Sequence, residues 1–99
     1  MQARVSTYSG WAAQVDDGVR NFEGRMDALR ELEGFQGAYL LVDRHGGRVM
    51  TITLWSTEQA AEASAERASQ LRQEAAGGAG LSIDSVGTYE VALRTEPSL

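Results

Sequence analysis

The segment 48–55 constrains the fold most, because it carries apolar side chains at both odd and even positions. Successive residues of a β-strand point to opposite faces of the sheet. One face of this segment would carry Met50, Ile52 and Leu54, and the other Val49, Thr51, Thr53 and Trp55. A strand that is apolar on both faces is usually central and covered on both sides. We therefore expect an inner strand here, and the pattern leaves open which face meets the helices.

Three further segments have strand character. Residues 37–43 precede the turn 44–47, which contains Gly46 and Gly47, so this strand and 48–55 are predicted to form a hairpin. Residues 3–8 and 81–93 also alternate and contain β-forming residues. The chain thus has four predicted strands, and Gly87 is expected to mark a bulge in the last one.

The first of two helical patterns lies between the first two strands. Its apolar stripe consists of Val15, Val19, Phe22, Met26, Leu29 and Leu32. Gly34 is expected to end this helix. Gly18 and Gly24 lie inside it, each at a cost of about 1 kcal/mol relative to Ala. Such glycines would suit positions where another element packs closely.

The second helical pattern covers residues 56–76. Ser56 and Gln59 have the spacing of a capping box, and Gly77 and Gly78 are expected to end the helix. Its inner stripe consists mostly of small side chains, namely Ala61, Ala65, Ala68, Leu71 or Arg72, and Ala75. Two arrangements remain open: the helix lies very close to the sheet, or a space that a ligand could fill remains between them.

The order strand, helix, hairpin, helix, strand predicts an α+β fold of the ferredoxin-like β-α-β-β-α-β type. Right-handed crossovers would place both helices on one face of a four-stranded sheet, with the first and third strands central and parallel and the other two as antiparallel edges. The 99 residues suit one domain, 1–99, in which 94–99 form a polar tail.

The face of the sheet that the helices leave uncovered is predicted to be apolar. It would carry either the residues around Met50 and Ile52 or those around Val49 and Trp55. A soluble monomer does not normally expose an apolar surface of several hundred Å². We therefore expect a homodimer in which the two sheets face each other across a two-fold axis.

Composition excludes several classes of function. The chain has no Cys, which excludes disulfides, thiolate metal sites and cysteine nucleophiles. Its net charge of -5 argues against nucleic-acid binding, and a single histidine, His45, is a poor basis for a metal site. No apolar segment is long enough to span a membrane. The first residues lack the apolar core of a signal peptide, so the expected location is the cytoplasm.

Several short motifs suggest a family. They are residues 34–40, Asp43, the Gly46-Gly47 turn, the run 51–60 and the segment 86–91. The sequence resembles the antibiotic-biosynthesis-monooxygenase-type proteins, which form dimeric α+β barrels. The resemblance implies a pocket between helices and sheet in each subunit. It also implies one of several activities: some members oxidise aromatic polyketide quinols with O₂ and no cofactor, and others bind and open haem.

Four residues are candidates for a binding site. The resemblance implies that Trp55 lies near the substrate, and the alternative is that it serves only as a core tryptophan. Tyr39 would donate a hydrogen bond to a substrate oxygen, or serve as a strand aromatic, and the same alternatives hold for Tyr8 and Tyr89. Thr51 would line the pocket. Arg72 would neutralise an oxyanion, or be solvated or paired with a neighbouring glutamate.

The sequence also departs from the family. Haem-binding members ligate iron through a histidine on the second helix, and the segment 56–76 has none, so we expect no haem and no other cofactor. Quinol-oxidising members tend to carry Asn on the third strand and Tyr early in the second helix, where this chain has Thr51, Thr53, Ala60 and Ala61. No carboxylate is placed to act as a general base. Two functions remain open: a cofactor-independent monooxygenase acting on aromatic phenols or quinols, and a non-catalytic domain that binds an apolar ligand or supports an assembly.

Overall fold

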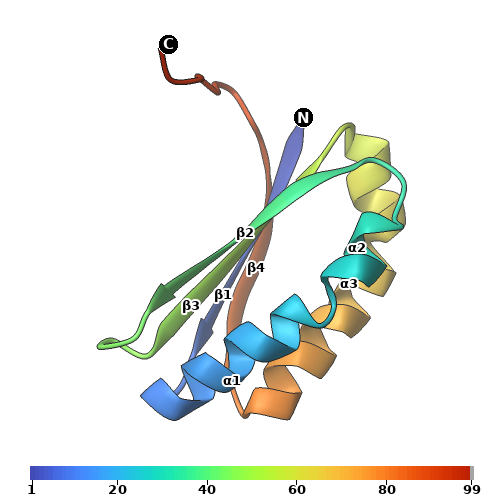
Figure 1. Cartoon of the computed structure of the whole chain (residues 1–99). Helices are drawn as coiled ribbons and strands as arrows, with labels where there is room; N and C mark the ends of the chain where they lie inside the picture. The colour runs from blue at the N-terminus through green and yellow to red at the C-terminus, as the bar shows by residue number, and fades with distance from the viewer. Residues whose placement is uncertain (99) are drawn as a thin grey trace.

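All helices lie on one face of a single four-stranded sheet in the computed structural model, which describes residues 1–98 (Figure 1). The elements in chain order are β1 (Gln2–Ser9), α1 (Ala12–Glu23), α2 (Met26–Arg30), β2 (Phe35–Asp43), β3 (Arg48–Trp55), α3 (Glu58–Ala79) and β4 (Ser82–Glu90). The strand order is β2-β3-β1-β4, so β1 and β3 are central. The predicted α+β class with ferredoxin-like order is confirmed.

The strand directions differ from the prediction in one respect. β1 and β3 are antiparallel, as are the other two pairs of neighbours in the sheet. The parallel strands of a split β-α-β unit are the ones that the helical connection joins, and a third strand lies between them. β3 follows β2 through a hairpin and enters the gap between β1 and β2, so it runs opposite to both. The expectation of a parallel central pair was wrong for this reason.

The structure decides which face of β3 meets the helices. Val49 and Trp55 are fully buried beneath the helical layer. The register pairs Val49 with Tyr8, Thr51 with Ser6 and Thr53 with Arg4, and these three residues of β1 are buried on the same face. Met50, Ile52 and Leu54 therefore lie on the other face, where no element of the described chain covers them (Figure 1). We call this second surface the open face.

The first helical pattern is divided between two helices. α1 ends at Gly24, whose amide donates a hydrogen bond to the Arg20 carbonyl at 3.0 Å, and α2 follows as a short separate helix. The close packing expected at Gly18 is present, because a Cβ there would lie 2.6 Å from Leu81 Cδ1. A Cβ at Gly24 would make only ordinary contacts at 3.6 Å. Gly24 therefore ends a helix and does not mark a close approach.

The long helix α3 differs from its predicted form at both ends. Thr57, and not Ser56, is the N-cap, and its side chain accepts a hydrogen bond from the Ala60 amide at 3.0 Å. The helix continues through Gly77 and Gly78 and ends at Gly80, whose φ of 74° lies in the left-handed region. The buried stripe consists of Ala61, Ser64, Ala68, Leu71, Ala75, Ala76 and Ala79. Ala65, which was expected in this stripe, is exposed.

The last strand is shorter than predicted and its bulge lies elsewhere. β4 ends at Glu90, and residues 91–98 form no helix or strand and leave the sheet (Figure 1). The expected polar tail 94–99 lies in this stretch, with its final residue outside the described part. Thr7 pairs with Ser85 and Tyr8 with Ile83, which places the irregularity at Asp84 and not at Gly87. Among residues 1–98, no helix is both long and apolar enough to cross a membrane.

A candidate ligand cavity between the helices and the sheet

A small cavity separates the helical layer from the middle of the sheet. The centres of water-sized molecules can occupy about 40 Å³ of it. A buried water needs about 10–15 Å³ on this measure, so the space holds a few waters. The lining residues are Arg4, Ser6, Tyr8, Phe22, Arg25, Met26, Leu29, Ala38, Tyr39, Thr51, Thr53, Ala68, Leu71 and Arg72. The Ala-rich helix α3 therefore packs closely along most of its length and leaves a limited space beside Ala68.

The helical wall of the cavity is mainly apolar. Phe22 comes from the end of α1, Met26 and Leu29 from α2, and Leu71 from α3. The break at Gly24 turns the chain so that α2 lies above β2 and its apolar residues continue the wall. A concave site with an apolar lining and a few polar groups is typical of sites for small molecules.

Two hydroxyl groups meet on the sheet side of the cavity. The Tyr8 hydroxyl lies 3.0 Å from Thr51 Oγ1, and either group can donate. The Tyr8 ring is only 1% exposed and packs at 5.2 Å, in a tilted arrangement, against the Phe22 ring. Both residues belong to the central strands, so packing fixes the position of this polar pair.

Arg4 brings a buried guanidinium to the same wall. Arg4 is 6% exposed. Its Nη2 donates a hydrogen bond to the Ala61 carbonyl at 2.5 Å, and its Cζ lies 5.3 Å from the centre of the Trp55 ring. Its Nη1 is buried and has no hydrogen-bond partner among residues 1–98. A buried donor without a partner costs about 1–3 kcal/mol, and more when it is charged.

The charges around the cavity have one sign. Arg4, Arg25 and Arg72 line it, and no Asp or Glu does. Arg25 Nε lies 3.6 Å from a carboxylate oxygen of Glu74, whereas neither Arg4 nor Arg72 forms an ion pair among residues 1–98. Burial, and after it the positive charge of Arg72, lowers the pKa of the Arg4 guanidinium. The group nevertheless remains charged at neutral pH, because arginine is not deprotonated in proteins.

Three of the four predicted site residues border the cavity, namely Tyr39, Thr51 and Arg72. The Thr51 hydroxyl is one of the two hydroxyls that pair at the cavity, and the other belongs to Tyr8. Tyr39 is 58% exposed and pairs with Ile52 of the open face, so it contributes to both surfaces.

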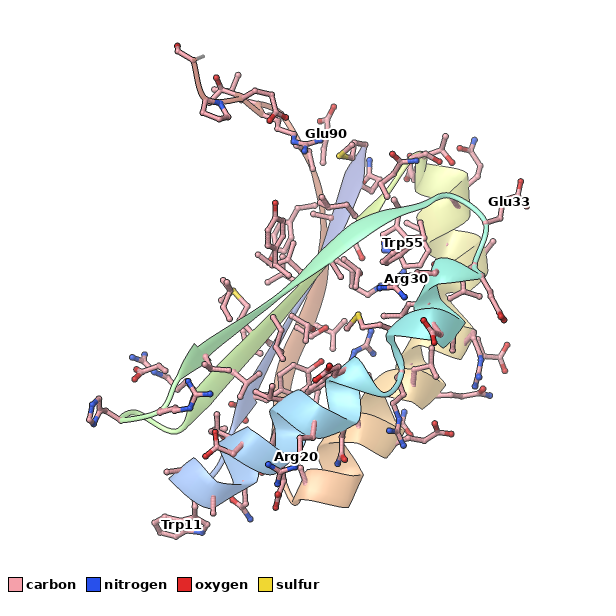
Figure 2. The ribbon with its side chains drawn as sticks, in the orientation of Figure 1. Trp11, Arg20, Arg30, Glu33, Trp55 and Glu90 are labelled. Atoms are coloured by element: carbon pink, nitrogen blue, oxygen red, sulfur yellow. The ribbon has the colours of Figure 1, made fainter. Side chains whose placement is uncertain are left out.

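Trp55 lies beside the cavity without lining it, between the sheet and the helical layer (Figure 2). It is fully buried, donates a hydrogen bond from Nε1 to Thr53 Oγ1 at 3.0 Å, and packs edge-on against Phe35 at 5.6 Å. Both of its suggested roles fit this place, since a core tryptophan that supports Arg4 also adjoins the cavity.

Sequence reasoning missed Arg4 and Arg25 as site residues. The signal for Arg4 was its alternation with Ser6 and Tyr8, which places all three on one face of β1. That face could be recognised as the inner one only through the pairing of β1 with β3. Arg25 gave no such signal, because its position depends on the break between α1 and α2.

The described chain offers no evident metal site. No group of three or more His, Asp or Glu side chains within residues 1–98 is arranged to hold a metal ion. His45 lies exposed in the hairpin turn between β2 and β3 and does not line the cavity.

Comparison with curated proteins gives relatives that match over 75 residues. Uncharacterized protein Rv2558 of Mycobacterium tuberculosis is 39% identical over 75% of this chain, and uncharacterized protein Rv2557 of the same organism is 33% identical over the same share. The chain spans about a third of the length of these relatives, 32% and 34%. No family model matches the chain.

Solved structures resemble the whole chain. A candidate antibiotic biosynthesis monooxygenase from Deinococcus radiodurans has a TM-score of 0.75 at 15% identity, with 99% of both chains covered. This chain has the fold of the antibiotic-biosynthesis-monooxygenase-type proteins. The monooxygenase ActVA-Orf6 of Streptomyces coelicolor, solved with nanaomycin D, has a TM-score of 0.73 at 19% identity and covers 98% of this chain and 92% of its own. The haem degrader MhuD of M. tuberculosis, solved with two haems, has a TM-score of 0.73 at 21% identity, over 97% and 100%.

Within this monooxygenase-type fold, the residues of this chain do not fit haem ligation by a histidine of the long helix. α3 carries no histidine, and the single His45 lies in the hairpin turn. Haem iron is commonly held by a proximal histidine, although Cys, Met and Tyr also serve. The ligation that the resemblance implies therefore has no residue here.

Proposed function

We propose that the protein is a small-molecule-binding homodimer that resembles the cofactor-independent monooxygenases and acts on an aromatic phenol or quinol. The observation that carries this proposal is the cavity between helices and sheet, whose wall is mainly apolar and whose few polar groups converge. Its place in a fold that oxygenases share adds support, although a fold alone does not determine an activity. The expected location in the cytoplasm is part of the same proposal.

The proposed roles follow from where the side chains lie. The paired hydroxyls of Tyr8 and Thr51 would bind a substrate oxygen, and Arg72 would face the negative charge that develops when a phenol ionises. Trp55 would hold Arg4 and the cavity wall in place from beneath. Tyr39 would lie at the edge of the cavity, while its register beside Ile52 places its ring on the open face.

A polycyclic substrate is larger than the present cavity, so binding requires part of the wall to move. Met26 is only half-buried and lies on α2, a helix of five residues. An unbranched methionine side chain adapts readily to a new shape. Displacement of Met26 would enlarge the cavity without disturbing the sheet.

Oxidation of an anthrone-type compound in air tests the catalytic proposal. The reaction converts a ring CH₂ and O₂ into C=O and H₂O, and the quinone product is followed by its absorbance. The proposal predicts turnover by the wild type that Trp55→Phe and Thr51→Val both reduce at least tenfold. Absence of turnover across a broad panel of phenols and anthrones would refute the catalytic role.

The homodimer is proposed from the open face. This surface carries Met50, Ile52 and Leu54 of β3 beside Tyr39 and Leu41 of β2, of which the last two are 58% and 48% exposed. The face also includes Tyr89 of β4, which is 60% exposed. Exposed apolar side chains gathered on one face are typical of an interface between subunits.

The alternative function is a non-catalytic domain that binds an apolar ligand or supports an assembly. Two observations favour it: the cavity is small, and no carboxylate or histidine lines it to act as a base. Thermal stabilisation by an aromatic ligand without any turnover would support this alternative, since a ligand that binds only the folded state raises the melting temperature.

A further inference from the structure

The guanidinium of Arg4 is a strongly polar group of the cavity whose presence the proposed function does not explain. It lies on a central strand and is more than nine-tenths buried. A charge that is removed from water is costly unless it is paired, and buried arginines normally have a carboxylate partner. Arg4 has none among residues 1–98, and its protein contacts are a backbone carbonyl and a tryptophan ring.

The contacts of Arg4 leave one part of the guanidinium free. Nη2 donates a hydrogen bond to the Ala61 carbonyl, and Cζ lies over the Trp55 ring at 5.3 Å from its centre. Nη1 has no partner among residues 1–98 and belongs to a residue of the cavity lining. These contacts fix the orientation of the group before any ligand arrives, which reduces the entropy lost on binding.

The surroundings of Arg4 add positive charge to the site. Arg72 also lines the cavity and lies close enough to lower the pKa of Arg4. Two neighbouring positive charges without a carboxylate are mutually destabilising in the empty protein. The chain as a whole has a net charge of -5, so two unpaired arginines at one cavity contrast with its overall charge.

The acidic side chains nearest to the two arginines line a neighbouring groove and not the cavity. Glu58 and Glu62 line an open groove between α3 and β4, to which Arg4 and Arg72 also contribute. Neither glutamate forms an ion pair with these arginines in the described structure. Within the cavity itself, no carboxylate of residues 1–98 offsets the positive charge of the two arginines.

We propose that the ligand of this cavity carries a carboxylate, which binds the free edge of Arg4 with Arg72 beside it, while its aromatic body packs against Phe22, Met26 and Leu71. A planar carboxylate matches the planar fork of a guanidinium, and the mainly apolar wall suits a single charge attached to an apolar body. This inference rests on the proposed small-molecule function and adds the chemical class of the ligand.

A matched pair of probes tests the inference. 2-Naphthoate and 2-naphthamide have nearly the same shape, and only the first carries a charge. Calorimetric titration at pH 7 should show that the wild type binds naphthoate at least tenfold more tightly than naphthamide. In Arg4→Met this preference should disappear while the affinity for naphthamide stays within twofold, and Arg72→Met should reduce the preference in part.

The control is Arg67→Met, which removes the same charge from the exposed side of α3, where Arg67 donates a hydrogen bond to Gln70 Oε1 at 3.4 Å. It should keep the full preference. If Arg4→Met fails to fold, the side-chain Nε–H resonance of Arg4 in the wild type still reports the contact, and it should shift with naphthoate and not with naphthamide.

The possible failures are distinguishable. Equal binding of the two probes would overturn the inference and leave the proposed small-molecule function intact. A preference that survives Arg4→Met in a folded protein would show that Arg4 does not bind the carboxylate, and would overturn the inference as well. No binding of either probe would count against both proposals.

Discussion

Individual residues of this chain show how far side-chain pattern alone determines a site. Strand alternation grouped Thr51 with Trp55 on one face of β3, and the structure shows that this face meets the helices. Arg4 was not expected in the interior, since a charged residue in a short strand is ordinarily expected at the surface. Only the register of β1 against β3, with Arg4 opposite Thr53, places it in the interior. Local pattern therefore predicted the strands well and the buried charge not at all.

Gly34 is a residue whose conformation only glycine adopts without strain. Its φ is 82°, and a Cβ there would lie 2.9 Å from Ser56 Oγ and would overlap Ala60. We expect Gly34→Ala to lower the free energy of unfolding by about 1–3 kcal/mol. Gly77→Ala is the matched control, because Gly77 lies inside α3 with nothing within 4 Å of the added Cβ, and it should stabilise the protein by about 0.5–1 kcal/mol. Urea titration of both variants checks this, and equal effects would contradict the account.

Asp43 gives the hairpin turn a dependence on pH. The amide of Gly46 and the side chain of Arg48 donate hydrogen bonds to its carboxylate at 3.0 and 2.7 Å, and they lower its pKa from the ordinary 3.8. The stabilisation is therefore present above pH 3.8 and is lost as pH falls through the lower folded-state pKa. Asp43→Asn should lower the melting temperature slightly at pH 7, and the difference from wild type should shrink towards pH 2. A difference that grows on acidification would contradict this assignment.

At the scale of elements, the order of strands and helices was predictable and their ends were not. The stripe of Val15, Phe22 and Leu29 is periodic enough to reveal a helical region, but it continues across the break at Gly24 because both helices bury the same side. The prediction that β1 and β3 are neighbours in the sheet was correct, but the prediction that they run parallel was wrong. Direction depends on the whole path of the chain, which no local pattern contains.

Ser56 and Thr57 both carry a hydroxyl at the start of α3, but only Thr57 caps the helix. The Thr57 hydroxyl accepts a hydrogen bond from the Ala60 amide, whereas the amide of Ser56 donates to the Gly34 carbonyl at 2.8 Å through the backbone. Thr57→Ala should therefore lower the free energy of unfolding by about 1 kcal/mol. Ser56→Ala keeps the backbone hydrogen bond and should have little effect. Chemical denaturation of the two variants distinguishes the assignments, and a larger loss in Ser56→Ala would favour the predicted capping box.

The whole molecule is a two-layer structure with one uncovered sheet face. The helices bury one side of the sheet, and the cavity lies where small side chains of α3 face the middle of β1 and β3. Sequence reasoning predicted this arrangement, because two helices can cover only one face of four strands. It could not predict the size of the cavity, which depends on how the α1–α2 break positions Met26 and Leu29 above the sheet.

The proposed dimer makes a prediction at the centre of the open face. Ile52 lies there between Val5 of β1 and Tyr39 of β2 and is half-buried in one chain. Ile52→Glu should place two like charges in the interface and shift the mass in solution from twice the chain mass of 10.7 kDa to the single value. Sedimentation equilibrium at micromolar concentration measures this. Gln70→Glu on the exposed side of α3 is the charge-matched control and should remain dimeric, and a wild type that is already monomeric would refute the dimer.

The most direct test of the cavity as the ligand site uses the three methionines of the chain, Met1, Met26 and Met50. Met26 lines the cavity, Met50 lies on the open face, and Met1 is at the N-terminus. With ¹³C-labelled methionine methyl groups, titration with 2-naphthoate should shift the Met26 resonance strongly and leave Met1 and Met50 nearly unchanged. A shift confined to Met50, or saturable binding that leaves Met26 unmoved, would contradict the account.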